Sequence, residues 1–474
     1  MKKEKNNKPS KELPLGFVDR QEKELLVRDY IISNIKEVMI KYGFQYLETP
    51  SFEYSDSIGK FLPDKDRPDE GVFSFKDENK WLSLRYDLTA PLARYVAKNY
   101  LEIPKPFKRY QLGTVWRNEK PGPGRFREFL QFDADYVGTK SLQADAELCI
   151  LLAETLTKCG LDKNEFIIRV SNRKCFFGLL DSLKIFEEEQ RNSIVRTVDK
   201  FERLGIEGIE SLLGKGRKDK SGDFTKGVGL EKKQVYSIVQ YIKENTFYDD
   251  SREELKGAAR FAPLGNWDDL SPLYNEGINE LQEIFDLTEL SDFKDQIVYA
   301  PTLVRGIQYY TGTIFEVNLL FKVKNQKGKE VEFGSIGGGG RYDNLVNRFG
   351  NIDVPCTGAS FGVDRLVYAL IQKKDFQIKI IRPIVICVFD KKRIPEYTKI
   401  LNKLRELNIS SEIYPGEGKL KKQMEYANKI GSPAVVLYGE NEIKSGKPTL
   451  RNLSSGEEKS IEIKELANEI KKII

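Results

Sequence analysis

The spacing of apolar residues predicts a chain in which helices and strands alternate. Apolar side chains recur every three or four residues over 19–42, which predicts an amphipathic helix that ends at Gly43. A strand pattern follows at 44–52, broken by Pro50, and another at 81–86. The segment 89–99 has proline in its first turn, where a helix tolerates it, and is predicted to be helical. The mixture indicates an α/β fold of the α+β type.

Residues 109–137 are predicted to form a long β-hairpin with arms at 109–117 and 127–137. The tip contains Pro-Gly-Pro-Gly at 121–124, which cannot continue either strand. Alternation along the second arm places four side chains on one face: Phe129, Gln131, Asp133 and Asp135. In the same way Arg117 and Glu119 share a face of the first arm. A strand face with a glutamine and two aspartates is a poor core face and a good floor for a polar ligand.

The rest of the pattern divides the chain into parts of different character. Helical segments joined by polar, glycine-rich stretches interrupt a β-rich core, and the last part has continuous apolar strands typical of a parallel sheet covered on both faces. The predicted parts are a disordered basic tail (1–13), the first part of the core (14–173), a helical insertion (174–296), the rest of the core (297–372), a linker (373–382) and a smaller C-terminal α/β domain (383–474).

Composition excludes several classes of protein. The chain has 474 residues, of which 40% are apolar and 31% charged, and it has no apolar run of the length that spans a membrane. Its five cysteines form no C-x-x-C pair, which favours a reducing, cytoplasmic location without zinc or disulfides. It contains no histidine, which excludes a Ser-His-Asp triad and histidine-ligated metals.

Positive charge is concentrated in two regions. Residues 105–128 hold seven basic against two acidic side chains, and residues 383–474 hold 17 against 13. Both regions suit a polyanion such as nucleic acid, although basic surface is often only solvated surface.

The two commonest nucleotide-binding loops are absent from the sequence. Instead, four arginines lie beside glycines in the β-rich core: Arg117, Arg305, Arg341 and Arg365. One such arginine is usually an ion-pair residue, but four together suggest a polyphosphate held by guanidinium groups. A strand at 331–336 is followed by four glycines, 337–340, and then by a predicted helix. The glycines would let the backbone approach a ligand closely, or they form an ordinary turn.

Several segments, in order, resemble the class II aminoacyl-tRNA synthetases and, within them, the histidyl-tRNA synthetases. The helix ending at Gly43 with the strand that contains Pro50 is similar to motif 1. WRNE and GRFREF, which lie between Trp116 and Phe129, are similar to motif 2. GASFGVDRL, from Gly358 to Leu366, is similar to motif 3. LVRGIQYYTG at 303–312 and GGGGRYD at 337–343 are similar to two histidine-specific signatures, and LRYDLT at 84–89 to the segment that holds the amino acid.

The resemblance implies a fold and an activity. The fold would be a class II antiparallel sheet flanked by helices, with a helical insertion that reaches the tRNA acceptor arm and a separate C-terminal anticodon-binding domain. The activity would be activation of L-histidine with ATP and Mg²⁺, followed by transfer of the histidyl group to the 3′ end of tRNA(His). A cytoplasmic homodimer that does not bind membranes would carry out this reaction.

The resemblance also implies roles for individual residues. Arg305 would be catalytic, and no metal would be held by the protein. The implied histidine-binding residues are Asp87, Thr89, Arg117, Gln131, Asp135, Arg305, Tyr309 and Tyr310. ATP would be bound by Arg117, Glu119 and Arg365. Gln308 occupies a position where an acidic residue is expected, which puts the tuning of imidazole recognition in question.

Two other functions compete with this one. The family includes regulatory relatives that do not charge tRNA, but those lack the C-terminal domain and lose catalytic arginines, whereas this chain keeps Arg305 and residues 383–474. The second alternative is a tRNA sensor built on a synthetase fold, although nothing in the sequence resembles an added effector domain. Tight tRNA binding without adenylate formation would favour the sensor.

Overall fold

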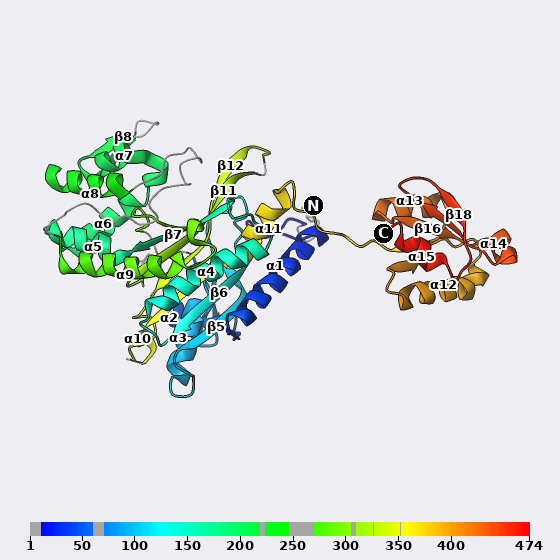
Figure 1. The fold of residues 1–474 in the computed structure, drawn as a ribbon, viewed down its shortest axis with the longest axis horizontal. Helices are drawn as coiled ribbons and strands as arrows, with labels where there is room; N and C mark the ends of the chain where they lie inside the picture. Colours follow the sequence, from blue (N-terminus) through cyan, green and yellow to red (C-terminus); the bar gives the residue numbers. More distant parts are fainter. Residues whose placement is uncertain are drawn as a thin grey trace, which may run out of the picture. The chain divides into compact units, whose positions relative to one another are not determined.

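The computed structural model describes residues 11–59, 71–218, 223–245, 270–304, 310–325, 327–350 and 352–474. The chain divides into two compact units, one that ends at Gln377 and one that runs from Ile378 to Ile474 (Figure 1). The boundary between the units lies within the segment predicted to be a linker. Among the described residues, none of the helices has the length and apolar character needed to cross a membrane.

An eight-stranded sheet forms the centre of the first unit, in the order β1-β5-β6-β13-β12-β11-β7-β10. The strands are β1 (Gln45–Tyr46), β5 (Phe107–Trp116), β6 (Glu128–Val137), β7 (Phe166–Asn172), β10 (Ile297–Tyr299), β11 (Thr313–Lys324), β12 (Glu330–Arg341) and β13 (Cys356–Gly362). Its inner pairs are antiparallel, and only the two edge pairs are parallel. The predicted hairpin is confirmed as β5 and β6.

Three helices pack together beside the sheet: α1 (Glu22–Lys41), α4 (Leu142–Lys158) and α11 (Val363–Gln372) (Figure 1). Val27, Ile31 and Ile35 are buried at four-residue spacing along α1, as its apolar pattern predicts. The helix ends where Gly43 takes φ +74°, a conformation that favours glycine. The predicted helix at 89–99 is α3 (Thr89–Asn99), and the helix predicted after Arg341 is only the four-residue α10 (Asn347–Gly350).

The glycine run lies in the middle of the sheet and is not a turn. Strand β12 continues through Gly337–Gly340, between β11 and β13. A Cβ atom on Gly337 would lie 2.3 Å from the carbonyl oxygen of Ser360, and one on Gly339 would lie 2.1 Å from that of Gly358. The strand therefore needs residues without side chains to pack this closely between its neighbours.

A small sheet of order β2-β4-β3 has an unusual distribution of side chains. It consists of β2 (Phe52–Tyr54), β3 (Ser74–Asp77) and β4 (Lys80–Leu84), with the short helix α2 (Ser55–Gly59) after β2. The break predicted at Pro50 is confirmed, because the segment 44–52 divides between two separate strands, β1 and β2. The inward face of the small sheet is polar, since Glu53 and Ser83 are buried.

The outward face of the small sheet is largely apolar, with the charged side chains of Asp77 and Lys80 at one end. Phe52, Tyr54 and Phe75 are paired with Leu84 or Leu82 across the sheet, so that all five side chains share one face. The three aromatic side chains remain 44–49% exposed. We call these five residues the apolar face.

The segment predicted to be a helical insertion consists mainly of helices. These are α5 (Arg173–Ser182), α6 (Glu188–Val198), α7 (Phe201–Leu213), α8 (Lys232–Asn245) and α9 (Pro272–Glu289), followed by the 3₁₀ helix η2 (Lys294–Gln296). A two-stranded hairpin, β8 (Gly216–Lys218) and β9 (Phe224–Lys226), was not predicted. Helix α9 packs against α5 and α4, and Lys174 on α5 pairs with Glu276 and Glu280 on α9.

The second unit has its own five-stranded sheet of order β15-β14-β16-β17-β18. Its elements are β14 (Ile384–Ile386), η3 (Lys391–Arg393), α12 (Ile394–Glu406), β15 (Ser411–Ile413), α13 (Leu420–Ile430), β16 (Ala434–Leu437), α14 (Glu440–Ser445), β17 (Thr449–Asn452), β18 (Glu458–Ser460) and α15 (Leu466–Lys471). Ile384 and Ile386 belong to one apolar cluster while Val385 belongs to another, so both sheet faces are covered.

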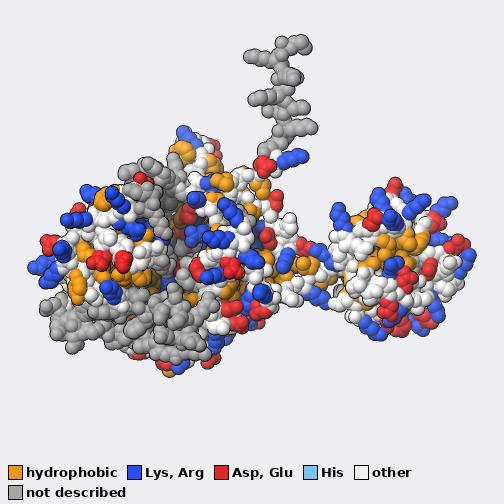
Figure 2. Space-filling view, turned by 90° about the horizontal axis from the view of Figure 1, so that it is seen from above, with side chains coloured by type: hydrophobic (Ala, Val, Ile, Leu, Met, Phe, Trp, Pro, Cys, Tyr) orange, Lys and Arg blue, Asp and Glu red, His pale blue; other side chains and the backbone are white. Residues whose placement is uncertain are grey.

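The parallel arrangement predicted for this unit is confirmed for β15, β14 and β16. The last two strands are antiparallel and were not predicted. On the face of this unit that Figure 2 shows, basic and acidic side chains surround an apolar area.

Candidate active site

A cavity in the first unit is lined by residues of β6, β12 and β13, by the start of α3, and by residues next to the ends of β5, β11 and β12. Six of the residues predicted to bind the amino acid line it: Asp87, Thr89, Arg117, Gln131, Asp135 and Tyr310. The other lining residues are Asp133, Gly338, Gly339, Tyr342, Gly358, Ala359 and Ser360. Arg305, Gln308 and Tyr309 lie outside the described residues.

Strand β6 supplies the floor of the cavity, as its alternation predicts. Gln131, Asp133 and Asp135 are 4%, 1% and 2% exposed. The neighbouring strand makes room for them, because a Cβ atom on Gly358 would lie 1.9 Å from Oδ1 of Asp135. Small residues on β13 therefore allow carboxylates to occupy the interior of the sheet.

The polar groups of the floor form a connected network. Gln131 donates from Nε2 to Oδ1 of Asp133 at 2.8 Å, and Thr89 donates from Oγ1 to Oδ2 of the same carboxylate at 3.3 Å. Asp87 accepts the backbone N–H groups of Thr89 and Ala90 at 3.2 and 2.9 Å, which fixes the start of α3.

Asp135 is held by two partners beneath the floor. The guanidinium of Arg109, which is fully buried, places Nε 3.3 Å from Oδ2 of Asp135. The phenol of Tyr342 donates to Oδ1. Arg109 also donates from Nη2 to the carbonyl oxygen of Leu88 at 2.7 Å, so it joins the floor to the start of α3.

The electrostatics of the cavity disfavour negative charge on its own carboxylates. Burial raises the pKa of Asp87, Asp133 and Asp135 above the ordinary value. For Asp133 the charge of Asp135 raises the pKa further. The pKa of Tyr310 is raised by burial and by the charges of the three aspartates. A cation in the cavity would relieve this repulsion.

Arg117 is positioned at the cavity by hydrogen bonds and by two rings. Its Nε donates to the carbonyl oxygen of Tyr86 at 3.1 Å, and its Nη2 donates to Oε1 of Gln131 at 3.2 Å. The guanidinium carbon lies 4.5 Å from the centre of the Tyr86 ring and 5.3 Å from that of Phe129. Glu119 accepts the Tyr86 hydroxyl at 2.6 Å, and burial together with Glu119 raises the pKa of Tyr86 to about 12.

Arg365, at the start of α11, does not line the cavity. It donates from Nη2 to the carbonyl oxygen of Phe333 at 2.8 Å, and its guanidinium carbon lies 4.3 Å from the centre of the Phe333 ring. Burial and the nearby Arg125 lower its pKa to about 10. Its Nε and Nη1 are buried and have no hydrogen-bond partner within the described ranges, so two donors are available to an anion.

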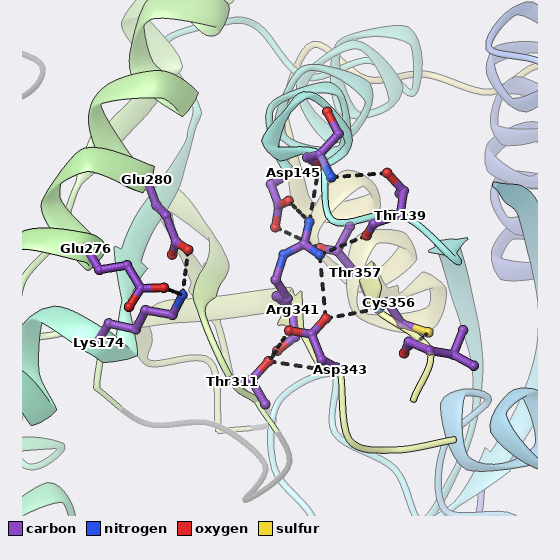
Figure 3. Close-up of polar contacts among 12 residues, drawn as sticks. Thr139, Asp145, Lys174, Glu276, Glu280, Thr311, Arg341, Asp343, Cys356 and Thr357 are labelled. Carbon is purple, nitrogen blue, oxygen red and sulfur yellow. Dashed lines mark hydrogen bonds and ion pairs between the residues drawn. The ribbon is translucent and has the colours of Figure 1, made fainter. Parts of the chain in front are cut away.

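The position of Arg341 differs from the one expected from the sequence. It was expected to join the phosphate-binding arginines, but it is not among the residues that line the cavity. Its side chain instead pairs with the buried Asp145 (Figure 3). It also donates to the carbonyl oxygens of Thr139 and Ser141 at 3.0 and 3.2 Å. These partners begin α4, so Arg341 joins the central sheet to a helix.

Comparison with known proteins identifies the family. A family model described as histidyl-tRNA synthetase matches residues 16–366. The chain belongs to the histidyl-tRNA synthetase family. A second model, described as an anticodon binding domain, matches residues 383–473, in the second unit.

Similar histidine–tRNA ligases cover almost the whole chain. That of Bartonella bacilliformis is 45% identical over 97% of this chain and 93% of its own length, and that of Pelagibacter ubique is 45% identical over 99% and 100%. Among solved structures, a histidyl-tRNA synthetase from a Nostoc species has a TM-score of 0.72 at 27% identity and covers 98% of this chain and 100% of its own. The predicted class II fold with a separate anticodon-binding domain is confirmed.

Three polar residues of the cavity were not assigned a role from the family resemblance: Asp133, Tyr342 and Ser360. The alternation along β6 had already placed Asp133 on the ligand face, so this signal was available. Tyr342 lies in the GGGGRYD segment, but its contact with Asp135 depends on the pairing of distant strands and has no signal within its own segment.

Asp133→Asn is expected to stabilise the protein at pH 8. Burial and Asp135 raise the pKa of Asp133 in the folded state above the value of about 4 in the unfolded chain. Ionisation of Asp133 therefore destabilises the folded state at a pH above its raised pKa, and this cost is absent below about pH 4. The gain, on the order of 1 kcal/mol, should therefore be present at pH 8 and vanish near pH 4. Thermal unfolding of both proteins across this pH range measures it.

The control for this comparison is Asp295→Asn, at an exposed position in η2. This variant is expected to change stability by no more than about 0.5 kcal/mol at either pH. Destabilisation by Asp133→Asn at pH 8 would contradict the repulsion between the buried carboxylates.

Proposed function

We propose that the chain activates histidine with ATP in the cavity and then transfers the histidyl group to tRNA. The reaction class follows from membership of the histidyl-tRNA synthetase family. In the first step a carboxylate oxygen of histidine attacks the α-phosphorus of ATP, and the bond to pyrophosphate breaks. In the second step a hydroxyl of the terminal tRNA ribose attacks the carbonyl carbon, and AMP leaves.

The charge distribution of the cavity supports an amino acid as its ligand. Asp87, Asp133 and Asp135 are buried, and a cationic group would relieve their repulsion. We assign the α-ammonium group to Asp87 and Thr89, as the family resemblance implies. Gln131 and Asp135 complete the site.

The negative groups of the ligands, the carboxylate of histidine and the α-phosphate of ATP, have a matching partner in Arg117. Its guanidinium is fixed by Tyr86 and Gln131, and we propose that it binds the α-phosphate and the carboxylate. Preorganised cations of this kind stabilise charge that develops in the transition state. Tyr310 lines the cavity beside these groups and would pack against the imidazole. Tyr309 and the catalytic Arg305 are assigned by family resemblance alone.

The nucleotide would extend beyond the cavity. We propose that Glu119 binds the adenine amino group and that Arg365 binds the γ-phosphate, for which its two unpartnered donors are suited. The described residues contain no group of three or more carboxylates or cysteines that could hold a metal. We propose that Mg²⁺ enters with ATP, bound mainly to its phosphates.

The second unit is proposed to bind the anticodon arm of tRNA. It matches the anticodon-binding domain model, and residues 383–474 carry 17 basic against 13 acidic side chains. Contacts to phosphates should make tRNA affinity fall with salt. This domain, and the retention of Arg117 and Arg365, favour a ligase over a non-catalytic regulator. All five cysteines are unpaired and buried, which supports a reducing, cytoplasmic location.

The test of this function is amino-acid-dependent exchange of pyrophosphate into ATP. Exchange with histidine, and with none of the other nineteen amino acids, is the expected result. Exchange with a different amino acid would refute the substrate. No exchange in a folded protein that binds tRNA would favour the regulator or the sensor.

We also propose that the chain is a homodimer that buries the apolar face. The small sheet directs polar Glu53 and Ser83 inward and aromatic Phe52, Tyr54 and Phe75 outward, the reverse of an ordinary half-exposed sheet. An apolar surface of this kind marks an interface. A second copy is the proposed occupant because motif 1, the dimer-interface element of class II synthetases, begins the same part of the chain.

Phe75→Glu is expected to convert the dimer to a monomer, since it places a charge in the apolar face. Light scattering after size exclusion should give twice the chain mass of 54.5 kDa for the unmodified protein and the single mass for the variant. Phe224→Glu, at an exposed aromatic position of β9, is the control and should remain dimeric. A monomeric unmodified protein would contradict the proposal.

A further inference from the structure

Two segments that flank the cavity are joined to each other by hydrogen bonds. Thr311 donates from its backbone N–H to the carbonyl oxygen of Arg341 at 2.7 Å, and from Oγ1 to Oδ2 of Asp343 at 2.9 Å. The N–H of Asp343 in turn lies 3.3 Å from Oγ1 of Thr311. Figure 3 shows these residues side by side. We call the Thr311–Asp343 pair the latch.

Asp343 connects the latch to a third strand. Its Oδ1 accepts the backbone N–H of Cys356, at the start of β13, at 3.1 Å and lies 3.5 Å from Nη1 of Arg341 (Figure 3). The Asp343 carboxylate thus contacts the hydroxyl of Thr311, the backbone N–H of Cys356 and the guanidinium of Arg341, and these three contacts fix its position. A half-buried carboxylate with a charged partner makes stronger hydrogen bonds than a neutral group would.

Arg341 gives the latch a rigid support. Its guanidinium is bonded to Asp145 and to two backbone carbonyl oxygens, and Asp145 also accepts the hydroxyl of Thr357 at 3.0 Å. The side chains of Arg341 and Asp145 are 6% and 0% exposed. A buried pair with these additional hydrogen bonds is costly to disrupt, so the end of β12 is held in place.

Both latch residues are direct neighbours of tyrosines that line the cavity. Thr311 follows Tyr310, and Asp343 follows Tyr342. Neither Thr311 nor Asp343 is among the described residues that line the cavity. The latch therefore joins the residues that directly follow the two tyrosines, and it lies outside the cavity.

We propose that the latch is a positioning element for recognition of the amino-acid side chain, an inference that rests on the proposed histidine activation. With the latch closed, Tyr310 and Tyr342 are held at a fixed spacing around the imidazole, and Tyr342 keeps its hydrogen bond to Asp135. Loss of the latch would loosen Tyr310, because the chain before Thr311 would lose its side-chain attachment to Asp343. Groups that bind ATP would be unaffected, since Arg117 and Arg365 have separate partners.

The test replaces Thr311 with valine, which keeps the shape of the side chain and removes the hydroxyl. Histidine-dependent pyrophosphate exchange should show a KM for histidine raised about fivefold or more, while the KM for ATP changes less than about twofold. Thr311→Ser keeps the hydroxyl and should restore a near-normal KM. The melting temperature of each full-length variant separates positioning from loss of fold.

Thr313→Val is the matched control. Thr313 lies two residues away and is fully buried, and its hydroxyl has no hydrogen-bond partner in the described structure. The same chemical change there should leave both KM values unchanged.

Three results would overturn the proposal. An unchanged KM for histidine in Thr311→Val would show that the latch does not position the tyrosines. A parallel rise in both KM values, with a lower melting temperature, would make the latch merely structural. An absence of exchange with histidine in the unmodified protein would refute the proposed function itself, and the latch with it.

Discussion

Replacing Arg117 with alanine is expected to lower histidine-dependent pyrophosphate exchange by at least about a hundredfold, because one preorganised donor to a developing charge contributes a factor of about 10²–10³. The guanidinium is held by Tyr86 and Gln131 and lies over the rings of Tyr86 and Phe129. The position of its positive charge is therefore fixed before the reaction begins. The exchange rate at saturating histidine and ATP measures the effect.

Two further variants make this result specific. Arg117→Lys keeps the charge but loses the planar pair of donors, so it should recover only part of the rate. Arg196→Ala removes an exposed arginine from α6 and should leave the rate unchanged. If Arg117→Ala retains exchange within a few-fold of the unmodified rate, Arg117 does not stabilise the reacting phosphate.

Removal of residues 378–474 is expected to separate the two steps of the reaction. Histidine-dependent exchange should stay within about twofold, whereas aminoacylation of tRNA should fall at least about a hundredfold, equivalent to losing about 3 kcal/mol of tRNA binding. We expect this because the two units are separately compact, so the first can fold without the second. The two apolar clusters of the second unit contain buried residues only from Ile384 to Ile470.

Two measurements on the shortened protein check this expectation. Circular dichroism should show a cooperative thermal transition, so that lost charging cannot be attributed to unfolding. Equal losses of exchange and charging would instead mean that the second unit supports the folding or the dimer of the first.

The hydrophobic pattern predicted the elements that have strong local signals. The helix at 89–99 and the arms of the β5–β6 hairpin were placed to within a few residues, because proline and alternation define them locally. The antiparallel strands β17 and β18 were missed, since both are short and polar. Strand β17 is held by pairing with β16, and β18 by pairing with β17.

The candidate site could be predicted only in part. Alternation along β6 correctly grouped Gln131, Asp133 and Asp135 on the face that lines the cavity. Arg341 could not be placed in the same way, because its partner Asp145 is 196 residues away in the chain and lies on α4. A local pattern reports which face a side chain takes but not which distant residue it meets there.

The glycine tract of β12 restricts how this site can change in evolution. Every missense mutation of a glycine codon adds at least a Cβ atom, and at each of Gly337–Gly340 that atom would lie 2.1–2.7 Å from a backbone oxygen of a neighbouring strand. Four successive codons are therefore closed to gradual substitution, whatever the chemistry of the new residue. A change of amino-acid substrate would therefore require substitutions on β6 or at Tyr310 and Tyr342, where one side chain can be exchanged for another.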